Sequence, residues 1–213
     1  MKIEQLSEHI GAEISDVDLG NLGSDEITEI KSAWLDHKVL VFRDQHITTK
    51  DHIAFGRNFG ELEIHPFAEN LDDYPEVILL EAGGDSPRQH YNAAKDWHID
   101  VSFREKPPLG SILRGKVIPK TGGDTCFASS SAAYEKLDSD IKSRVDNLFA
   151  VNDYTKMFGP NTRFNDDESH VENIKKYPPV LHPVIRTHPE TGGRSIFTNN
   201  FFTSHIDGVE TPE

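Results

Sequence analysis

Apolar positions in the first third of the chain recur at helical spacing around one short apolar run. Their period predicts an amphipathic helix over residues 25–37, with Ser24 as its N-cap. The run at 38–43 is rich in β-forming residues and is typical of a buried strand. A second helix is expected over residues 49–59, ended by Gly60 in a left-handed conformation.

The middle of the chain reads mostly as strands. Short apolar runs bounded by glycine or proline predict strands over residues 76–81, 110–118 and 124–128. A stripe of apolar residues over 130–150 then predicts a helix with a break near Asp138.

The last part combines a long polar segment with a hairpin. Residues 152–177 show no period, and a loop of that length is typical of a lid over a binding site. Residues 181–187 and 194–199 flank a glycine-containing turn and predict a β-hairpin. Helices first and strands later, without βαβ alternation, favour a mainly β sandwich or barrel with flanking helices.

The composition is that of an acidic globular protein with one domain. The 213 residues include 22 Lys and Arg against 36 Asp and Glu, a formal charge of -14, which argues against nucleic-acid and membrane-surface partners. Because we see neither a signal peptide nor a membrane-length apolar run, we expect a cytoplasmic protein. The single cysteine, Cys126, excludes an internal disulfide and a multi-cysteine zinc site, and its apolar neighbours predict a buried side chain.

The segment 97–103 carries the most informative chemistry. Residues two apart in a strand face the same side, so His98 and Asp100 would present an imidazole and a carboxylate together. Such a pair supplies two of the three ligands of the 2-His-1-carboxylate triad that holds Fe(II). Taken alone, this H-x-D pair is more typical of a surface histidine and an aspartate that caps a turn than of a metal site.

Longer blocks extend this pattern. They are the segment 97–103, the G-G-D-T run at 122–125, His65 followed by proline, and H-P-V-I-R-T-H-P-E-T-G at 182–192. In order and spacing they resemble the taurine dioxygenase (TauD/TfdA) family of Fe(II)- and 2-oxoglutarate-dependent dioxygenases. The likeness covers nearly the whole chain.

The resemblance implies a double-stranded β-helix, or jelly roll, in a single domain over 1–213, with helices packed outside. It implies His98 and Asp100 as ligands of Fe(II), with 2-oxoglutarate and O2 as co-substrates and Thr125 bonded to 2-oxoglutarate. Four residues match positions that line the substrate pocket: His65, Val101, Phe158 and Phe202. These residues also fit ordinary roles, as a turn cap for His65 and as core for the apolar three.

Some family features are absent from this sequence. The second histidine ligand and the arginines that pair with 2-oxoglutarate follow far beyond the H-x-D pair, and the sequence ends at Glu213 before such a block. We therefore name no third ligand, and expect a jelly roll incomplete at its C-terminus, truncated before that block, and weak iron binding by the 213-residue form. Ala68 and Ala94 replace polar residues of taurine-specific members, which favours a different, less polar substrate.

By this resemblance, the intact protein hydroxylates a small organic anion, such as a sulfonate, sulfate ester or aryloxy acid, and releases succinate and CO2. We expect a homo-oligomer, either a dimer or a tetramer. Two alternatives stay open: a catalytically silent jelly-roll binding protein, and a metal-dependent hydrolase or isomerase that uses His98 and Asp100. Oxygen consumption that requires 2-oxoglutarate would exclude both.

Overall fold

The computed structural model describes residues 1–65, 70–80, 97–158 and 167–210, which form ten strands and six helices. The chain divides into two compact units. Unit 1 comprises Met1–Leu79 and Gly110–Ser129, and unit 2 comprises Leu80–Leu109 and Ser130–Glu213. None of the helices in the described ranges is both long and apolar enough to cross a bilayer.

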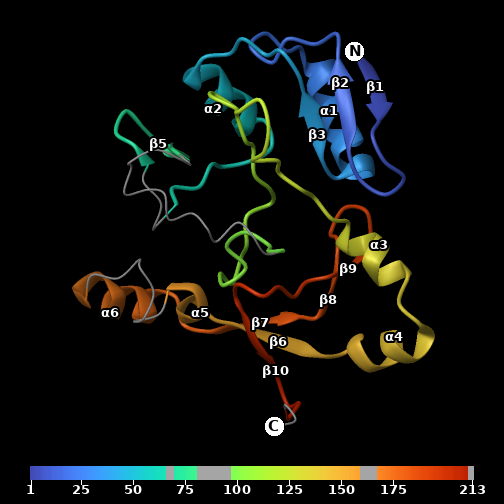
Figure 1. Cartoon of the computed structure of the whole chain (residues 1–213), viewed down its shortest axis with the longest axis vertical. Helices are drawn as coiled ribbons and strands as arrows, with labels where there is room; N and C mark the ends of the chain where they lie inside the picture. The colour runs from blue at the N-terminus through green and yellow to red at the C-terminus, as the bar shows by residue number, and fades with distance from the viewer. Residues whose placement is uncertain (66–69, 81–96, 159–166, 211–213) are drawn as a thin grey trace. The chain divides into compact units, whose positions relative to one another are not determined.

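Unit 1 contains a three-stranded sheet with a helical crossover. Strand β1 (Lys2–Gln5) pairs antiparallel with β2 (Ala12–Ser15), and β2 pairs parallel with β3 (Leu40–Phe42). Parallel neighbours need a long connection, and α1 (Ser24–His37) supplies it, as Figure 1 shows in blue. The predicted first helix and strand are therefore confirmed, although Gly23 and not Ser24 occupies the N-cap position.

A second helix, α2 (Thr49–Arg57), completes the core of unit 1. Its N-terminus is capped by Thr48, whose hydroxyl oxygen accepts the Asp51 amide at 3.2 Å. Hydrogen bonds from Thr48 in turn hold the pKa of the Asp51 carboxyl below its usual value. The helix ends at Arg57 with Asn58 as its C-cap, so Gly60, with a φ of 151°, is not its left-handed terminator. The buried core comprises Leu19, Ile30, Ile47 and Phe55.

A short hairpin of β4 (Asn70–Leu71) and β5 (Tyr74–Ile78) also belongs to unit 1. The Arg57 guanidinium donates to the Glu76 carboxylate at 2.9 Å, which ties the end of α2 to β5. The strand predicted over 76–81 thus exists but begins two residues earlier.

The segment Gly110–Ser129 forms no strand, so the strands predicted over 110–118 and 124–128 are wrong. Its apolar side chains are largely exposed, with Val117 at 92% of its full accessibility. Cys126 is exposed as well, which corrects the expectation of a buried thiol. A β-propensity run becomes a strand only when another strand offers a hydrogen-bonding edge, and no described strand pairs with this segment.

Gly110 lies against the indole ring of Trp34. A Cβ at residue 110 would lie 2.7 Å from Cζ2 of Trp34, well inside van der Waals contact. The ring has little freedom to move, because its Nε1 donates to the Lys38 carbonyl at 3.0 Å and it packs edge-on against Phe59.

We therefore expect Gly110→Ala to lower the free energy of unfolding by about 1–3 kcal/mol, read from the midpoint of urea unfolding. Gly115→Ala is the matched control, because its Cβ would meet only the exposed, flexible side chain of Ile118. That control should change stability by less than about 0.5 kcal/mol. Equal midpoints for the two variants would contradict the contact.

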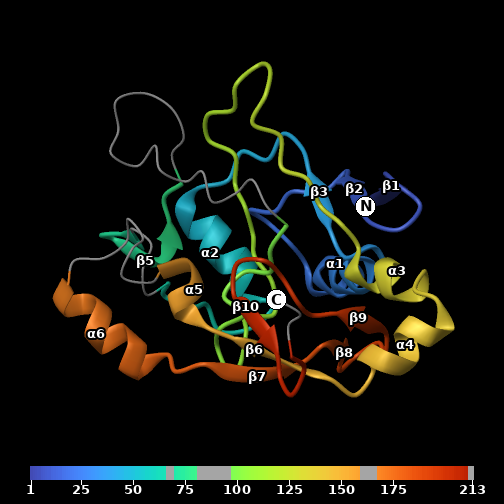
Figure 2. The ribbon, with the colours of Figure 1, turned by 60° about the horizontal axis from the view of Figure 1, so that its bottom comes forward.

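Unit 2 is built on an antiparallel sheet in the order β10-β6-β7. These strands are Thr203–Ile206, Phe149–Asn152 and Val180–Pro183. A separate hairpin joins β8 (Ile185–Thr187) to β9 (Arg194–Ile196), which confirms the predicted hairpin. Figure 2 shows β6 and β7 running beside each other at the base of this unit.

Helices α3 (Ser130–Glu135) and α4 (Ser139–Val145) precede the sheet of unit 2 along the chain, and α3 is in contact with β9. The predicted break at Asp138 is confirmed, since this residue is the N-cap of α4 in an extended conformation. The Asp146 carboxylate accepts from the Tyr134 hydroxyl and the Arg194 guanidinium, each at 2.9 Å. The bond from Arg194 lowers the pKa of Asp146, while burial raises the pKa of Tyr134.

The segment 152–177 is not one long loop. Its described part contains α5 (Tyr154–Phe158) and α6 (Asp167–Lys176). The Asp153 carboxylate accepts the Thr155 amide at 2.7 Å and so caps the first turn of α5. α5 is too short to show a helical period, and α6 is mostly polar, which explains why the sequence of this segment gives no visible period.

Candidate active site

His98 and Asp100 lie side by side, as predicted, but on a turn. The backbone over 100–103 forms a turn and not the expected strand. Nε2 of His98 nevertheless lies 3.3 Å from Oδ1 of Asp100, and the two side chains are 33% and 57% exposed. Both groups are therefore paired and still accessible from solvent.

The residue directly after Asp100 has a strained backbone conformation. Val101 has a φ of 53°, a left-handed conformation that is unusual for a β-branched residue. Its carbonyl accepts the Arg104 amide at 3.1 Å, which closes the turn. Such strain costs of order 1–3 kcal/mol and persists only where surrounding contacts fix the backbone.

Ser102 supplies the first of these contacts and is completely buried. Its hydroxyl donates to Oδ1 of Asn152 at 3.3 Å and accepts from Nδ2 of Asn199 at 2.9 Å. The Thr203 hydroxyl also donates to Oδ1 of Asn152, at 3.2 Å. These four side chains form a polar network between the turn, β6 and β10, which we call the Ser102 network.

Phe103 supplies the second contact, as the centre of an aromatic cluster. Its ring centroid lies 5.6 Å from Tyr154, 5.4 Å from Tyr177 and 5.0 Å from Phe202. Burial raises the pKa of Tyr154 in this cluster. Phe202, predicted to line the substrate pocket, is buried against Phe103, so the structure gives it a packing role and leaves its pocket role a prediction.

Phe201, which the sequence analysis did not single out, contacts the histidine directly. Its ring stacks on the His98 imidazole with centroids 4.6 Å apart and planes inclined by 3°. The amides of Phe201 and Phe202 both donate to Oδ1 of Asn199, each at 3.0 Å. Nothing in the local sequence around Phe201 signals this contact, because it joins residues about a hundred positions apart.

The pair fits a divalent metal by geometry and by chemistry. Two ligand atoms at ordinary bond lengths of about 2.1 Å and at a right angle are about 3 Å apart, close to the 3.3 Å found here. Imidazole and carboxylate are donors that suit Fe(II). Within the described ranges, no group of three His, Cys, Asp or Glu side chains comes together to hold a metal.

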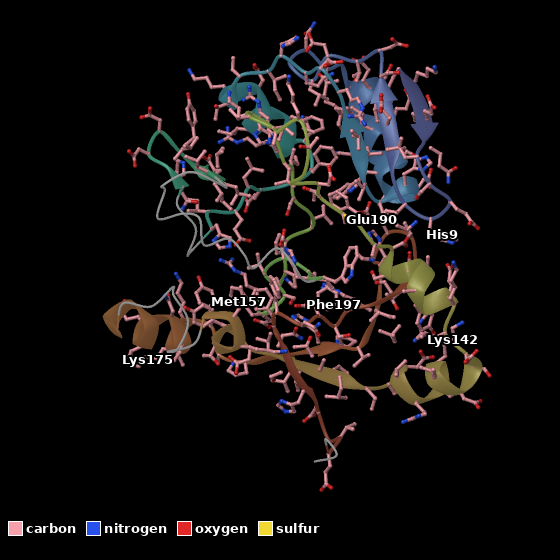
Figure 3. The ribbon with its side chains drawn as sticks, in the orientation of Figure 1. His9, Lys142, Met157, Lys175, Glu190 and Phe197 are labelled. Atoms are coloured by element: carbon pink, nitrogen blue, oxygen red, sulfur yellow. The ribbon has the colours of Figure 1, made fainter. Side chains whose placement is uncertain are left out.

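His182 does not join this pair. It is buried, and its Nε2 is 2.8 Å from the carbonyl oxygen of Arg104. Its ring packs edge-on against Phe197, which Figure 3 labels within unit 2. The His182 ring nitrogen thus fixes the backbone at the end of the turn.

The structure brings His98, Asp100, Val101 and Phe202 together in unit 2. His65 and Thr125 belong to unit 1, where the His65 carbonyl accepts from Asn70 at 3.1 Å and Thr125 is exposed. Phe158 is the last residue of α5, but its side chain lies outside the described part of the chain, as do Ala68 and Ala94.

Comparison with known proteins identifies the family. The family model described as "Taurine catabolism dioxygenase TauD, TfdA family" matches residues 2–213. The chain belongs to the TauD/TfdA family. The resemblance inferred from the sequence blocks is therefore confirmed, and membership implies 2-oxoglutarate and O2 as co-substrates with Fe(II) as the metal.

Relatives and a solved structure agree with this assignment. The chain is 32% identical over 99% of its length to a "(S)-phenoxypropionate/alpha-ketoglutarate-dioxygenase" of Sphingobium herbicidovorans, covering 74% of that protein. It is 35% identical over 95% of its length to an "Alkylsulfatase" of Acinetobacter baylyi, covering 64% of that protein. The crystal structure of a taurine dioxygenase from Burkholderia xenovorans matches 98% of the chain with a TM-score of 0.79 and 34% identity, covering 66% of that structure. The TauD/TfdA chain described here thus has the fold of taurine dioxygenase and spans about two thirds to three quarters of these proteins.

Proposed function

We propose that this protein is an Fe(II)- and 2-oxoglutarate-dependent dioxygenase that hydroxylates a small organic anion and releases succinate and CO2. The proposal rests on one observation above all: an imidazole and a carboxylate 3.3 Å apart on a strained, anchored turn. Family membership supports the same reaction class.

His98 and Asp100 would hold the iron, which when bound supplies the oxidative chemistry with O2 and 2-oxoglutarate. The chain's own residues bind and orient the reactants around that ion. The Thr125 hydroxyl would donate a hydrogen bond to 2-oxoglutarate, and His65 would donate one to an anionic group of the substrate. Val101, Phe158 and Phe202 would form the apolar wall of the substrate pocket.

We infer a sulfate ester or aryloxy acid as the substrate, in preference to a small amino sulfonate. The names of two relatives mention phenoxypropionate and alkyl sulfate chemistry. In this sequence, Ala68 and Ala94 also lack the hydrogen-bonding groups that would grip a small sulfonate or amine.

The proposal also includes the core architecture, the cellular location, the oligomeric state and a lid. A jelly-roll core, a cytoplasmic location, a dimer or tetramer and a lid over residues 152–177 stay predictions.

The reaction is tested with the protein expressed from its complete reading frame. Succinate formation and O2 consumption are measured with Fe(II) and 2-oxoglutarate, against a panel of alkyl sulfates, aryloxy acids and sulfonates including taurine. We expect turnover that requires 2-oxoglutarate, fastest with a sulfate ester or an aryloxy acid. Product formation without 2-oxoglutarate would support the hydrolase alternative, and binding without turnover would support the silent binding protein.

The role of Thr125 is tested by Thr125→Val, which removes the hydroxyl but keeps the shape of the side chain. Loss of one hydrogen bond of about 1–1.5 kcal/mol should raise the apparent KM for 2-oxoglutarate about tenfold, with a smaller effect on kcat. Thr121→Val is the matched control, because it removes another exposed hydroxyl from the same segment. An unchanged KM for Thr125→Val would remove this residue from the 2-oxoglutarate site.

A further inference from the structure

The side chain of Asn199 joins the turn that carries Asp100 to the backbone of Phe201 and Phe202. Nδ2 donates to the buried Ser102 hydroxyl at 2.9 Å. Oδ1 accepts two backbone amides, those of Phe201 and Phe202, at 3.0 Å each. Its own backbone amide donates to the Thr203 hydroxyl at 3.1 Å. These fixed partners point to a positioning role for Asn199.

The first route from Asn199 leads to His98 through an aromatic ring. By fixing the amide of Phe201, Oδ1 of Asn199 sets the direction of the backbone that carries this ring. The ring lies parallel to the His98 imidazole, with centroids 4.6 Å apart. The plane of a histidine decides where its Nε2 lone pair points, so a neighbour that holds this plane also holds the metal-binding direction.

The second route leads to Asp100 through the turn itself. Ser102 lies two residues after Asp100, on the far side of Val101 with its φ of 53°. A backbone in this conformation relaxes unless its neighbours are fixed. Because Asn199 and Asn152 both bind the Ser102 hydroxyl, they hold the end of the turn.

We propose that Asn199 is the positioning residue of the iron-binding pair: through Phe201 it holds the plane of His98, and through Ser102 it holds the turn that carries Asp100. This inference rests on the proposed function in one respect, the identity of His98 and Asp100 as metal ligands. The stack and the turn are properties of the metal-free protein and are tested separately.

The test uses two readouts on the same variants. In the metal-free protein, NMR reports the ring protons of His98, which the ring current of Phe201 shifts upfield. Titration with Mn(II), followed by EPR of the free ion, reports metal affinity. For Asn199→Ala we expect loss of the upfield shift and Mn(II) binding weaker by about 10-fold, as for other groups that orient a metal ligand.

Two further variants separate the two routes. Asn199→Asp keeps an oxygen acceptor for the amides of Phe201 and Phe202 but loses the donor to Ser102, so it should keep the upfield shift and lose part of the Mn(II) affinity. Phe201→Leu removes the stack and keeps the Ser102 network. It should therefore lose the upfield shift of the His98 ring protons, which Asn199→Asp keeps. If Asn199→Ala fails to fold, this second pair still decides the proposal.

The matched control is Tyr134→Phe, which removes a hydrogen bond to Asp146 elsewhere in unit 2. It should leave the His98 shift and the Mn(II) affinity unchanged. Unchanged shift and affinity in Asn199→Ala, or equal Mn(II) loss in Tyr134→Phe, would overturn the positioning role. Unchanged Mn(II) binding in His98→Ala would instead refute the ligand pair, and with it the proposed function. The stack is still tested in that case, by comparing the His98 ring shift of the parent protein with that of Asn199→Ala.

Discussion

Replacing His98 by alanine is expected to lower 2-oxoglutarate-dependent succinate formation by more than about 100-fold, because even groups that merely orient a metal ligand contribute about 10–100-fold. Asp100→Ala should have an equal effect, since it removes the carboxylate of the 2-His-1-carboxylate set. Turnover is measured as succinate released per enzyme with saturating Fe(II) and co-substrate.

The urea midpoints of both variants should stay close to that of the parent protein, because the two side chains are 33% and 57% exposed. His188→Ala is the matched control. His188 is a half-buried histidine whose Nδ1 accepts amides within the β8–β9 turn, so its loss should leave turnover intact. Retained turnover in His98→Ala or Asp100→Ala would refute the ligand assignment.

Phe103→Ala is expected to produce the largest loss of stability, about 3–5 kcal/mol in the free energy of unfolding. The ring is 1% exposed and lies between Tyr154, Tyr177 and Phe202, so its removal leaves a cavity that these rings cannot all close. Urea unfolding followed by far-UV circular dichroism measures the change.

Phe149→Ala provides the comparison, because it deletes the same side chain from a site on β6 that is 47% exposed. Its cost should be under about 2 kcal/mol, since much less apolar area returns to water. A Phe103 variant no less stable than the Phe149 variant would show that the aromatic cluster does not support the turn.

Local patterns in the sequence predicted the helices and breaks that depend on interactions between residues close together in the chain. The helix over 25–37 follows from the spacing of its apolar residues, and the break at Asp138 from the change in that spacing. The pairing of His98 with Asp100 was also correct, although for a different reason. A strand would have placed them on one face, whereas here residues 97–99 form no strand and a turn begins at Asp100. The left-handed Val101 that follows was not predicted, because β-branched residues rarely adopt that conformation.

Features that depend on distant partners were beyond the sequence. The runs at 110–118 and 124–128 have β propensity, but propensity does not reveal whether another strand lies alongside. The stack of Phe201 on His98 and the bond from Asn199 to Ser102 each join the turn to residues far along the chain. Only the tertiary fold brings such residues together.

The exposed apolar side chains of Gly110–Ser129 also have a consequence for handling the protein. At neutral pH the formal charge of -14 makes molecules repel one another, which opposes sticking through side chains such as Val117 and Leu113. Acidification protonates carboxylates and weakens this electrostatic repulsion, while the exposed apolar surface stays unchanged. Acidic buffers therefore favour precipitation of this polypeptide, and alkaline buffers of low ionic strength keep it dispersed.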